Sequence, residues 1–287
     1  FYDIFCSINS LARSTVFSRH TFSSLTVEDG LPINFIEYLS LDSKGFLWVS
    51  TQGGGLVRYD GYEFVLFNTN GTLFELRSNN IRQTYEDVYN RLWIISDAGI
   101  DIVDLSTMQK INHLFDHNQQ LKKIMNSPAT SIYNDSKNNL WIVNDGAISK
   151  VVFSDKGEVE RVHSLSPNTV HSKSPFSSVC EIDGEIWIGS YGLFKIEQNQ
   201  SGYLVLYPIS EASELALSGL VTKIYKTKDT VWLGTEYGLW SYNVGNKITK
   251  HYRYNSAEAN SLSQDMVTDI SQMSDGRLVV STLRGLN

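Results

Sequence analysis

Short alternating runs of apolar and polar residues recur along this chain, and they share one pattern. Each copy has an apolar run with a tryptophan at its centre, then a short polar segment, then a glycine followed by another apolar residue. The first copy is Gly45–Gly61, with its tryptophan at Trp48. The equivalent positions are Trp93, Trp141, Trp187, Trp232 and Val279. The pattern therefore returns every 45 to 48 residues, and it takes up five of the six tryptophans. A strand-rich repeat of this length is typical of a β-propeller with one four-stranded blade per repeat.

Within the first repeat the pattern predicts an inner strand over Phe35–Leu41 and a second strand over Phe46–Thr51. An outer strand is expected over Tyr62–Asn68. The second strand is apolar on both faces, as expected of a strand that lies between two neighbouring blades. The tryptophans are therefore predicted to be core residues between blades rather than ligand platforms. Only Asn118–Met125 has any helical character.

The repeats predict a single all-β domain, a β-propeller of four-stranded antiparallel blades, over residues 16–287. Residues 1–15 are expected to be an N-terminal extension, for which the remnant of a processed leader is one interpretation, although they lack the order of charges and apolar residues that a signal peptide has. Val16–Leu25 matches the outer-strand pattern, and we expect it to close the ring against the last blade. Six repeats are visible.

The composition narrows the possible functions. A formal charge of −7 and the lack of basic runs disfavour a nucleic-acid surface. No run of eighteen apolar residues is present, so no segment is expected to span a membrane. Two cysteines, Cys6 and Cys180, are too few for a disulfide framework, and Cys180 fits a small buried side chain.

The first repeat and the segment before it carry a resemblance. Leu25–Asn34, Asp42–Thr51 and Gly55–Gly61 are similar to the two-component regulator propeller repeat, and the resemblance extends from about Phe22 to Asn287. Two departures are Val279 in place of tryptophan and the absence of Arg-Tyr-Asp-Gly beyond the first copy. These departures argue against a ring of identical ligand positions.

The resemblance implies the periplasmic sensor region of a hybrid two-component system of the Bacteroidetes type, the extracytoplasmic part of an inner-membrane protein. This chain would be most of a first, seven-bladed propeller. A second propeller and an immunoglobulin-like domain of the same chain would follow, and then a membrane helix, a histidine kinase and a DNA-binding output domain. The expected ligands are oligosaccharides released from glycans, with induction of polysaccharide-utilisation genes as the output, and the protein is expected to be a homodimer.

Candidate ligand residues follow from where propeller loops converge. Loops between the second and third strands, and the starts of the inner strands, reach one end of the central axis from several blades. Amides, carboxylates and tyrosines at such positions suit sugars, because they pair with hydroxyls and stack on the ring. The positions are Asn34, Gln52, Arg82, Asp97, Asn144, Tyr191, Glu236, Tyr237 and Arg284. Any one of them is also an ordinary residue for a turn.

Other chemistry has weaker support. His113 and His117 are four residues apart, but they fall in a predicted loop with no third ligand nearby, so no metal or cofactor is expected. No Gly-x-Ser-x-Gly elbow is present, and no catalytic residue is assigned. Two alternatives remain open. One is a propeller lyase or glycoside hydrolase that uses Asp97, Asp145 or Glu236, and the other is a non-catalytic dimerisation scaffold.

Overall fold

The computed structural model describes residues 26–112, 118–144, 147–165, 176–209, 219–247, 249–258, 260–272 and 276–287. The proposed closing strand Val16–Leu25, the extension before it, Asp145 and both histidines His113 and His117 lie outside the described residues. A short 3-10 turn, η1 (Val27–Asp29), precedes the first strand, and Thr26 caps it.

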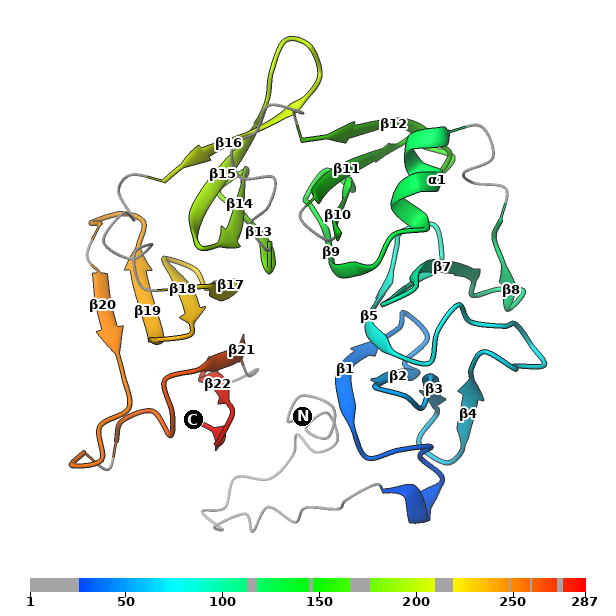
Figure 1. Cartoon of the computed structure of the whole chain (residues 1–287), viewed down its shortest axis with the longest axis horizontal. Coiled ribbons are helices and arrows are strands. Elements are labelled where there is room, and N and C mark those ends of the chain that lie inside the picture. The colour runs from blue at the N-terminus through cyan, green and yellow to red at the C-terminus, as the bar shows by residue number, and fades with distance from the viewer. Residues whose placement is uncertain are drawn as a thin grey trace, which may run out of the picture.

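The described chain folds into six antiparallel sheets that follow one another around an arc (Figure 1). The first is β1 (Ile36–Leu41), β2 (Leu47–Thr51), β3 (Leu56–Tyr59) and β4 (Phe64–Phe67). The second is β5 (Ile81–Glu86), β6 (Arg91–Ser96), β7 (Gly99–Asp104) and β8 (Gln109–Lys110). The third is β9 (Ala129–Asn134), β10 (Leu140–Asn144), β11 (Ala147–Phe153) and β12 (Val159–Ser164).

The remaining sheets repeat the same strand order. The fourth is β13 (Ser178–Ile182), β14 (Glu185–Ser190), β15 (Gly192–Gln198) and β16 (Leu204–Pro208). The fifth is β17 (Val221–Lys226), β18 (Thr230–Thr235), β19 (Gly238–Asn243) and β20 (Thr249–Tyr252). The sixth, around Val279, is β21 (Val267–Gln272), β22 (Leu278–Thr282) and β23 (Gly285–Leu286). The all-β propeller architecture is therefore confirmed with five four-stranded blades and one three-stranded sheet; a ring of seven blades stays a prediction.

The repeated tryptophans pack between neighbouring blades, as predicted. Trp48 and Trp93 are fully buried, while Trp141 and Trp187 are at most 7% exposed. Each joins a core cluster with residues of the next blade: Trp93, for example, packs with Ile132 and Ile142 of the third blade. Trp232 is partly buried against the sixth sheet. The core is thus a series of inter-blade layers, one at each tryptophan.

An aspartate in the turn before the second strand fixes three of these tryptophans. Asp42 Oδ1 accepts hydrogen bonds from the backbone N–H groups of Lys44 and Phe46, while its Oδ2 accepts from Trp48 Nε1 at 2.9 Å. Asp87 and Asp135 bind Trp93 and Trp141 in the same way, at 2.8 and 2.9 Å. One carboxylate therefore closes the hairpin turn and also satisfies a buried indole N–H group.

The only α-helix in the described part of the chain, α1 (Gln119–Met125), covers the layer between the second and third blades. Asn118 caps it by accepting a hydrogen bond from Leu121 N, and Leu121 and Met125 are buried. Gly99 makes this close packing possible, because its φ is 123° and a Cβ there would lie 2.3 Å from Met125 O. The weak helical pattern at Asn118–Met125 is thus confirmed by a short helix that depends on tertiary packing.

Candidate functional site

A β-bulge recurs near the start of the inner strands. The pairing of the first and second strands shifts by one residue in the first, second, third, fifth and sixth sheets. The residues left without a pairing partner are Glu37, Arg82, Thr130, Thr222 and Thr268. A bulge changes the direction of the side chain of its extra residue. The side chains at these five positions therefore do not follow the regular alternation between the two faces of the sheet.

Three of the bulge residues line one pocket. It has a volume of about 340 Å³ and is formed by three successive blades. We call it the inner-rim pocket, and its lining residues are Glu37, Gln52, Asn80, Ile81, Arg82, Asp97 and Thr130. Apart from the buried Ile81, all of these side chains are polar or charged.

Hydrogen bonds within the wall organise the inner-rim pocket. Asn80 Nδ2 donates to Asp97 Oδ2 at 2.7 Å. The backbone of Asn80 also forms an isolated antiparallel bridge with Gln52, which ties the first blade to the second. Hydrogen bonds from the Ser78 and Asn80 side chains, with the nearby Arg82 guanidinium, hold the pKa of Asp97 below its usual value of 3.8. Asp97 is therefore an ionised acceptor at neutral pH.

Arg82 and Glu37 give the inner-rim pocket charges of both signs. Both side chains are exposed, and so are Gln52 and Thr130. With Asp97, the lining carries two carboxylates, one guanidinium, two amides and a hydroxyl. Such a set donates and accepts hydrogen bonds in many directions, and it suits an uncharged ligand with several hydroxyl groups better than an apolar or a highly charged one.

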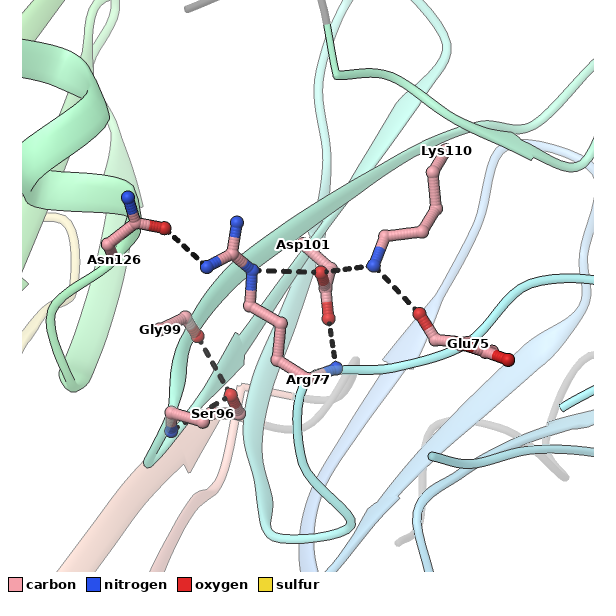
Figure 2. Close-up of polar contacts among 8 residues, drawn as sticks. Glu75, Arg77, Ser96, Gly99, Asp101, Lys110 and Asn126 are labelled. Carbon is pink, nitrogen blue, oxygen red and sulfur yellow. Dashed lines mark hydrogen bonds and ion pairs between the residues drawn. The ribbon is translucent and has the colours of Figure 1, made fainter. Parts of the chain in front are cut away.

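The loop before β5, residues 68–80, carries Ser78 and Asn80, and an ion cluster around a buried aspartate fixes it (Figure 2). Asp101 lies on β7 with its side chain only 2% exposed. It accepts hydrogen bonds from Arg77 N at 2.9 Å and Arg77 Nε at 3.2 Å, and it pairs with Lys110 Nζ at 2.8 Å. Lys110 Nζ also donates to Glu75 O at 2.7 Å. The cluster therefore holds the loop at two points just before the residues that contact Asp97.

Two other contacts complete this support. Arg77 Nη1 donates to Asn126 Oδ1 at 2.5 Å, which connects the loop to the end of α1. The Asn79 carbonyl accepts from the backbone N–H groups of Gly53 and Gly55 at 3.1 and 2.9 Å, which connects it to the β2–β3 loop. The inner-rim pocket is thus built on backbone that several separate contacts hold in place.

The structure brings together Gln52, Arg82 and Asp97, three of the residues that the sequence predicts as ligand contacts. Asn34 lies outside the pocket lining, and its Oδ1 accepts a hydrogen bond from Val27 N at 3.1 Å. Asn144 is buried, and its Nδ2 donates to the carbonyls of Ile124, Ser127 and Pro128 between α1 and β9, each at 3.2 Å. Ligand contact by Asn34 and Asn144 stays a prediction that the pocket does not require.

The other predicted residues lie on later blades. Tyr191 and Tyr237 are 58% and 49% exposed. Glu236 Oε2 accepts a hydrogen bond from Leu220 N at 3.1 Å, and Arg284 is exposed in the β22–β23 turn. None of these four residues lines the inner-rim pocket.

Sequence reasoning missed Glu37, Asn80 and Thr130. A usable signal existed, because all three lie at or just before the start of an inner strand, as Arg82 does. Placing the six inner strands in one register would have put Glu37, Arg82 and Thr130 at a common position.

A second crevice, between the third and fourth blades, is smaller, and part of its lining is apolar, from Trp141, Ile186, Ile196 and Leu204. It has a volume of about 230 Å³. Asp135 is held by Trp141, and both Glu181 oxygens accept from Ser136 at 2.7 Å. Lys150 Nζ lies 5.5 Å from the centre of the Trp141 ring, and burial lowers the pKa of this lysine. We therefore take the inner-rim pocket as the candidate functional site.

The described residues give no support for a metal centre or a membrane span. Among them, no group of three or more histidine, cysteine, aspartate or glutamate side chains is placed to hold a metal ion. The one helix in that part of the chain is too short to cross a bilayer.

Comparison with known proteins identifies the fold class. No family model and no curated protein matches the sequence. Solved structures do match: PorZ, a surface component of the type-IX secretion system of Porphyromonas gingivalis, has a TM-score of 0.66 and 15% identity. That match covers 91% of this chain and 40% of PorZ.

Two further structures come from signalling proteins. The extracellular domain of BT3049 from B. thetaiotaomicron, assigned to a hybrid two-component system, has a TM-score of 0.54 and 19% identity over 92% of this chain. The extracellular domain of BT4673 from the same organism has a TM-score of 0.56 and 15% identity over 88%. This chain covers 41% and 37% of those two chains, so it spans about two fifths of their length. The chain is thus similar in fold to extracellular domains of hybrid two-component systems.

Proposed function

We propose that this chain is an extracytoplasmic sensor module that binds an oligosaccharide in the inner-rim pocket without turning it over. The observation that carries the proposal is the convergence of six polar side chains from three blades on one pocket. Similarity in fold to the extracellular domains of BT3049 and BT4673 supports the sensor role. The resemblance in the first repeat supports a glycan as the ligand class.

Sugar binding fits the chemistry of the inner-rim pocket. The ionised Asp97 and the Gln52 and Asn80 amides can pair with neighbouring hydroxyls, while Arg82 donates in a planar fork. A ligand held by Glu37, Asp97 and Thr130 would contact the first, second and third blades at once. Binding would then favour one arrangement of these blades over others, which is the physical basis of a ligand-driven signal.

We place the module in the periplasm, as part of an inner-membrane protein of the hybrid two-component type. In that protein a second propeller and an immunoglobulin-like domain would follow it, and a homodimer would carry the signal to a histidine kinase. Change in the packing between these domains, rather than chemistry at the pocket, would be the output.

The enzyme alternative has one observation in its favour, because Glu37 and Asp97 line the same pocket. A glycosidase needs one carboxyl group whose pKa is raised so that it can act as the acid. The pKa of Asp97 is lowered, so Asp97 is suited to accept hydrogen bonds or act as a base but not to donate a proton.

The test is calorimetric titration against a panel of glycan oligosaccharides, with product analysis by chromatography on the same samples. We expect binding without cleavage, and about tenfold or greater loss of affinity in Asp97→Asn and Arg82→Gln. Asp265→Asn is the matched control, because Asp265 is likewise a carboxylate held by hydrogen bonds, with Arg253 Nη2 at 2.6 Å and Tyr254 N at 2.7 Å, but lies outside the pocket. Cleavage of any panel member would replace the sensor by an enzyme, and no binding at all would favour a scaffold.

A further inference from the structure

The contact that builds the inner-rim pocket is repeated between the fourth and fifth blades. In the first copy, Gln52 after β2 forms an isolated antiparallel bridge with Asn80, which directly precedes β5. In the second copy, Tyr191 after β14 forms the same bridge with Leu220, which directly precedes β17. Both bridges join the loop after the second strand of one blade to the start of the inner strand of the next blade, so they lie at the same end of the blades.

The acidic residue of the pocket also has a counterpart in the second copy. Asp97 follows β6 and accepts a hydrogen bond from Asn80. Glu236 follows β18, and its Oε2 accepts a hydrogen bond from Leu220 N at 3.1 Å, while Glu236 N donates to Leu220 O at 3.2 Å. In both copies a carboxylate after the second strand thus holds the residue before the inner strand. The second copy, which we call the second frame, therefore has its bridge and its carboxylate in the same places, although Asp97 is bonded by the Asn80 side chain and Glu236 by the Leu220 backbone.

Two of the side chains on this second frame are aromatic. Tyr191 replaces Gln52, Leu220 replaces Asn80, and Tyr237 adjoins Glu236. Tyr191 is 58% exposed and Tyr237 is 49% exposed. Two exposed tyrosines on either side of one inter-blade bridge give apolar ring surface beside a carboxylate.

Gly219 fixes the position of Tyr237. Its φ is 103°, and a Cβ there would lie 2.6 Å from Tyr237 Cε2 and 2.7 Å from Glu236 Oε2. The tyrosine ring and the carboxylate therefore both lie against the Gly219 backbone, and any larger residue would displace them. Tyr237 O is also held, at 2.9 Å from His251 Nε2. Tyr237 thus has a defined place on the surface.

We propose that Tyr191, Glu236 and Tyr237 form a second sugar subsite, in which a tyrosine ring stacks on the C–H face of a sugar and Glu236 accepts a hydroxyl hydrogen. This inference rests on the proposed function and deepens it: the ligand is an oligosaccharide long enough to reach both the inner-rim pocket and the tyrosine subsite. A stacked sugar ring fits better than a charged ligand here, because the frame offers aromatic faces and only one charged side chain.

The test uses the protein and a series of linear oligosaccharides from disaccharide to hexasaccharide, chosen from whichever panel member binds. We expect affinity to rise with chain length. Tyr191→Ala and Tyr237→Ala should each lower the affinity for the hexasaccharide about three- to tenfold and leave disaccharide binding in the inner-rim pocket unchanged. Tyr191→Phe should retain the affinity, because stacking uses the ring and not the hydroxyl group.

Tyr207→Ala is the matched control, since Tyr207 is 41% exposed but lies on the outer strand β16. Circular dichroism checks that each variant is folded. Hexasaccharide binding that is unchanged in both tyrosine variants, while Asp97→Asn still weakens it, would overturn the second subsite and leave the proposed function intact. Absence of any saccharide binding by the unmodified protein would overturn both. Loss of binding to a protein partner, with sugar binding unchanged, would identify the tyrosines as a protein contact and also overturn the subsite.

Discussion

Replacing Trp93 and Trp187 separately with phenylalanine should destabilise the protein by different amounts. Both tryptophans occupy the same position in their blades, and both are nearly buried, at 0% and 7% exposure. The volume lost and the cavity left behind should therefore be similar. Their hydrogen bonding differs: Trp93 Nε1 donates to Asp87 Oδ2 at 2.8 Å, whereas Trp187 Nε1 is buried without a hydrogen-bond partner in the described part of the chain.

The size of the difference follows from these contacts. A hydrogen bond to a charged group contributes about 1.5–3 kcal/mol, whereas removing an unpaired buried donor costs nothing and can stabilise. Asp87 retains Arg91 Nε, at 2.6 Å, and two backbone N–H groups, so Trp93→Phe does not leave its carboxylate without partners. We therefore expect Trp93→Phe to cost about 1.5 kcal/mol more than Trp187→Phe.

The assay is urea unfolding monitored by circular dichroism. The slope of the free energy of unfolding against urea concentration is compared between variants, so that the midpoints can be converted into free energies of unfolding. Trp141→Phe is an internal replicate, because Trp141 donates to Asp135 at 2.9 Å, and it should behave like Trp93→Phe. Equal losses at Trp93 and Trp187, within about 0.5 kcal/mol, would show that the turn aspartates do not stabilise the tryptophans and would refute this reasoning.

Three further predictions concern the support of the site and two titrating groups. Asp101→Asn should lower the free energy of unfolding by about 2 kcal/mol, because it weakens the pairing with Arg77 and Lys110. It should also speed proteolysis within residues 68–80, and an unchanged rate of cleavage there would contradict the anchoring role. The folded-state pKa of Asp97 is lowered, so its contribution to stability is present above the usual value of 3.8 and is lost as pH falls through the lower folded value. Asp97→Asn should accordingly lose less stability than the unmodified protein as the pH falls from above 3.8 through the lower folded-state pKa, as measured by urea unfolding at each pH. Burial raises the pKa of Cys180 to about 11, so in a Cys6→Ser background its thiol should react with iodoacetamide far more slowly at neutral pH than it does in urea; equal rates would show that it is accessible.

Much of the blade architecture could be predicted because it depends on periodicity. The repeated tryptophan position gave the register of the second strand in each repeat. The expected inner strand Phe35–Leu41 differs from β1 by one residue. The expected outer strand Tyr62–Asn68 is shorter in the structure, at Phe64–Phe67, because the Asp60 side chain accepts from Tyr62 N and Glu63 N and holds those residues in the turn.

The candidate site could be predicted only in part. Gln52 and Asp97 were found because the loop after the second strand recurs beside each tryptophan. Glu37 and Thr130 were missed because an alternating pattern does not reveal a bulge, which changes the direction of one side chain without changing the composition of the strand. Asn144 occupies a similar loop position, but the neighbouring α1 covers it and its amide satisfies three carbonyl groups.

The two halves of the described arc differ in how the indole N–H group of the repeated tryptophan is bonded, and we relate this difference to what each half would bind. The aspartate that bonds the indole N–H group is present in the first three blades, as Asp42, Asp87 and Asp135. The fourth and fifth blades have Glu181 and Lys226 at the sixth position before the tryptophan. The inner-rim pocket lies on the first three blades, where hydrogen bonds to hydroxyls need side chains fixed within a few tenths of an ångström. The tyrosines lie on the other two, where stacking tolerates a looser geometry because it depends on contact area rather than on the alignment of a single bond.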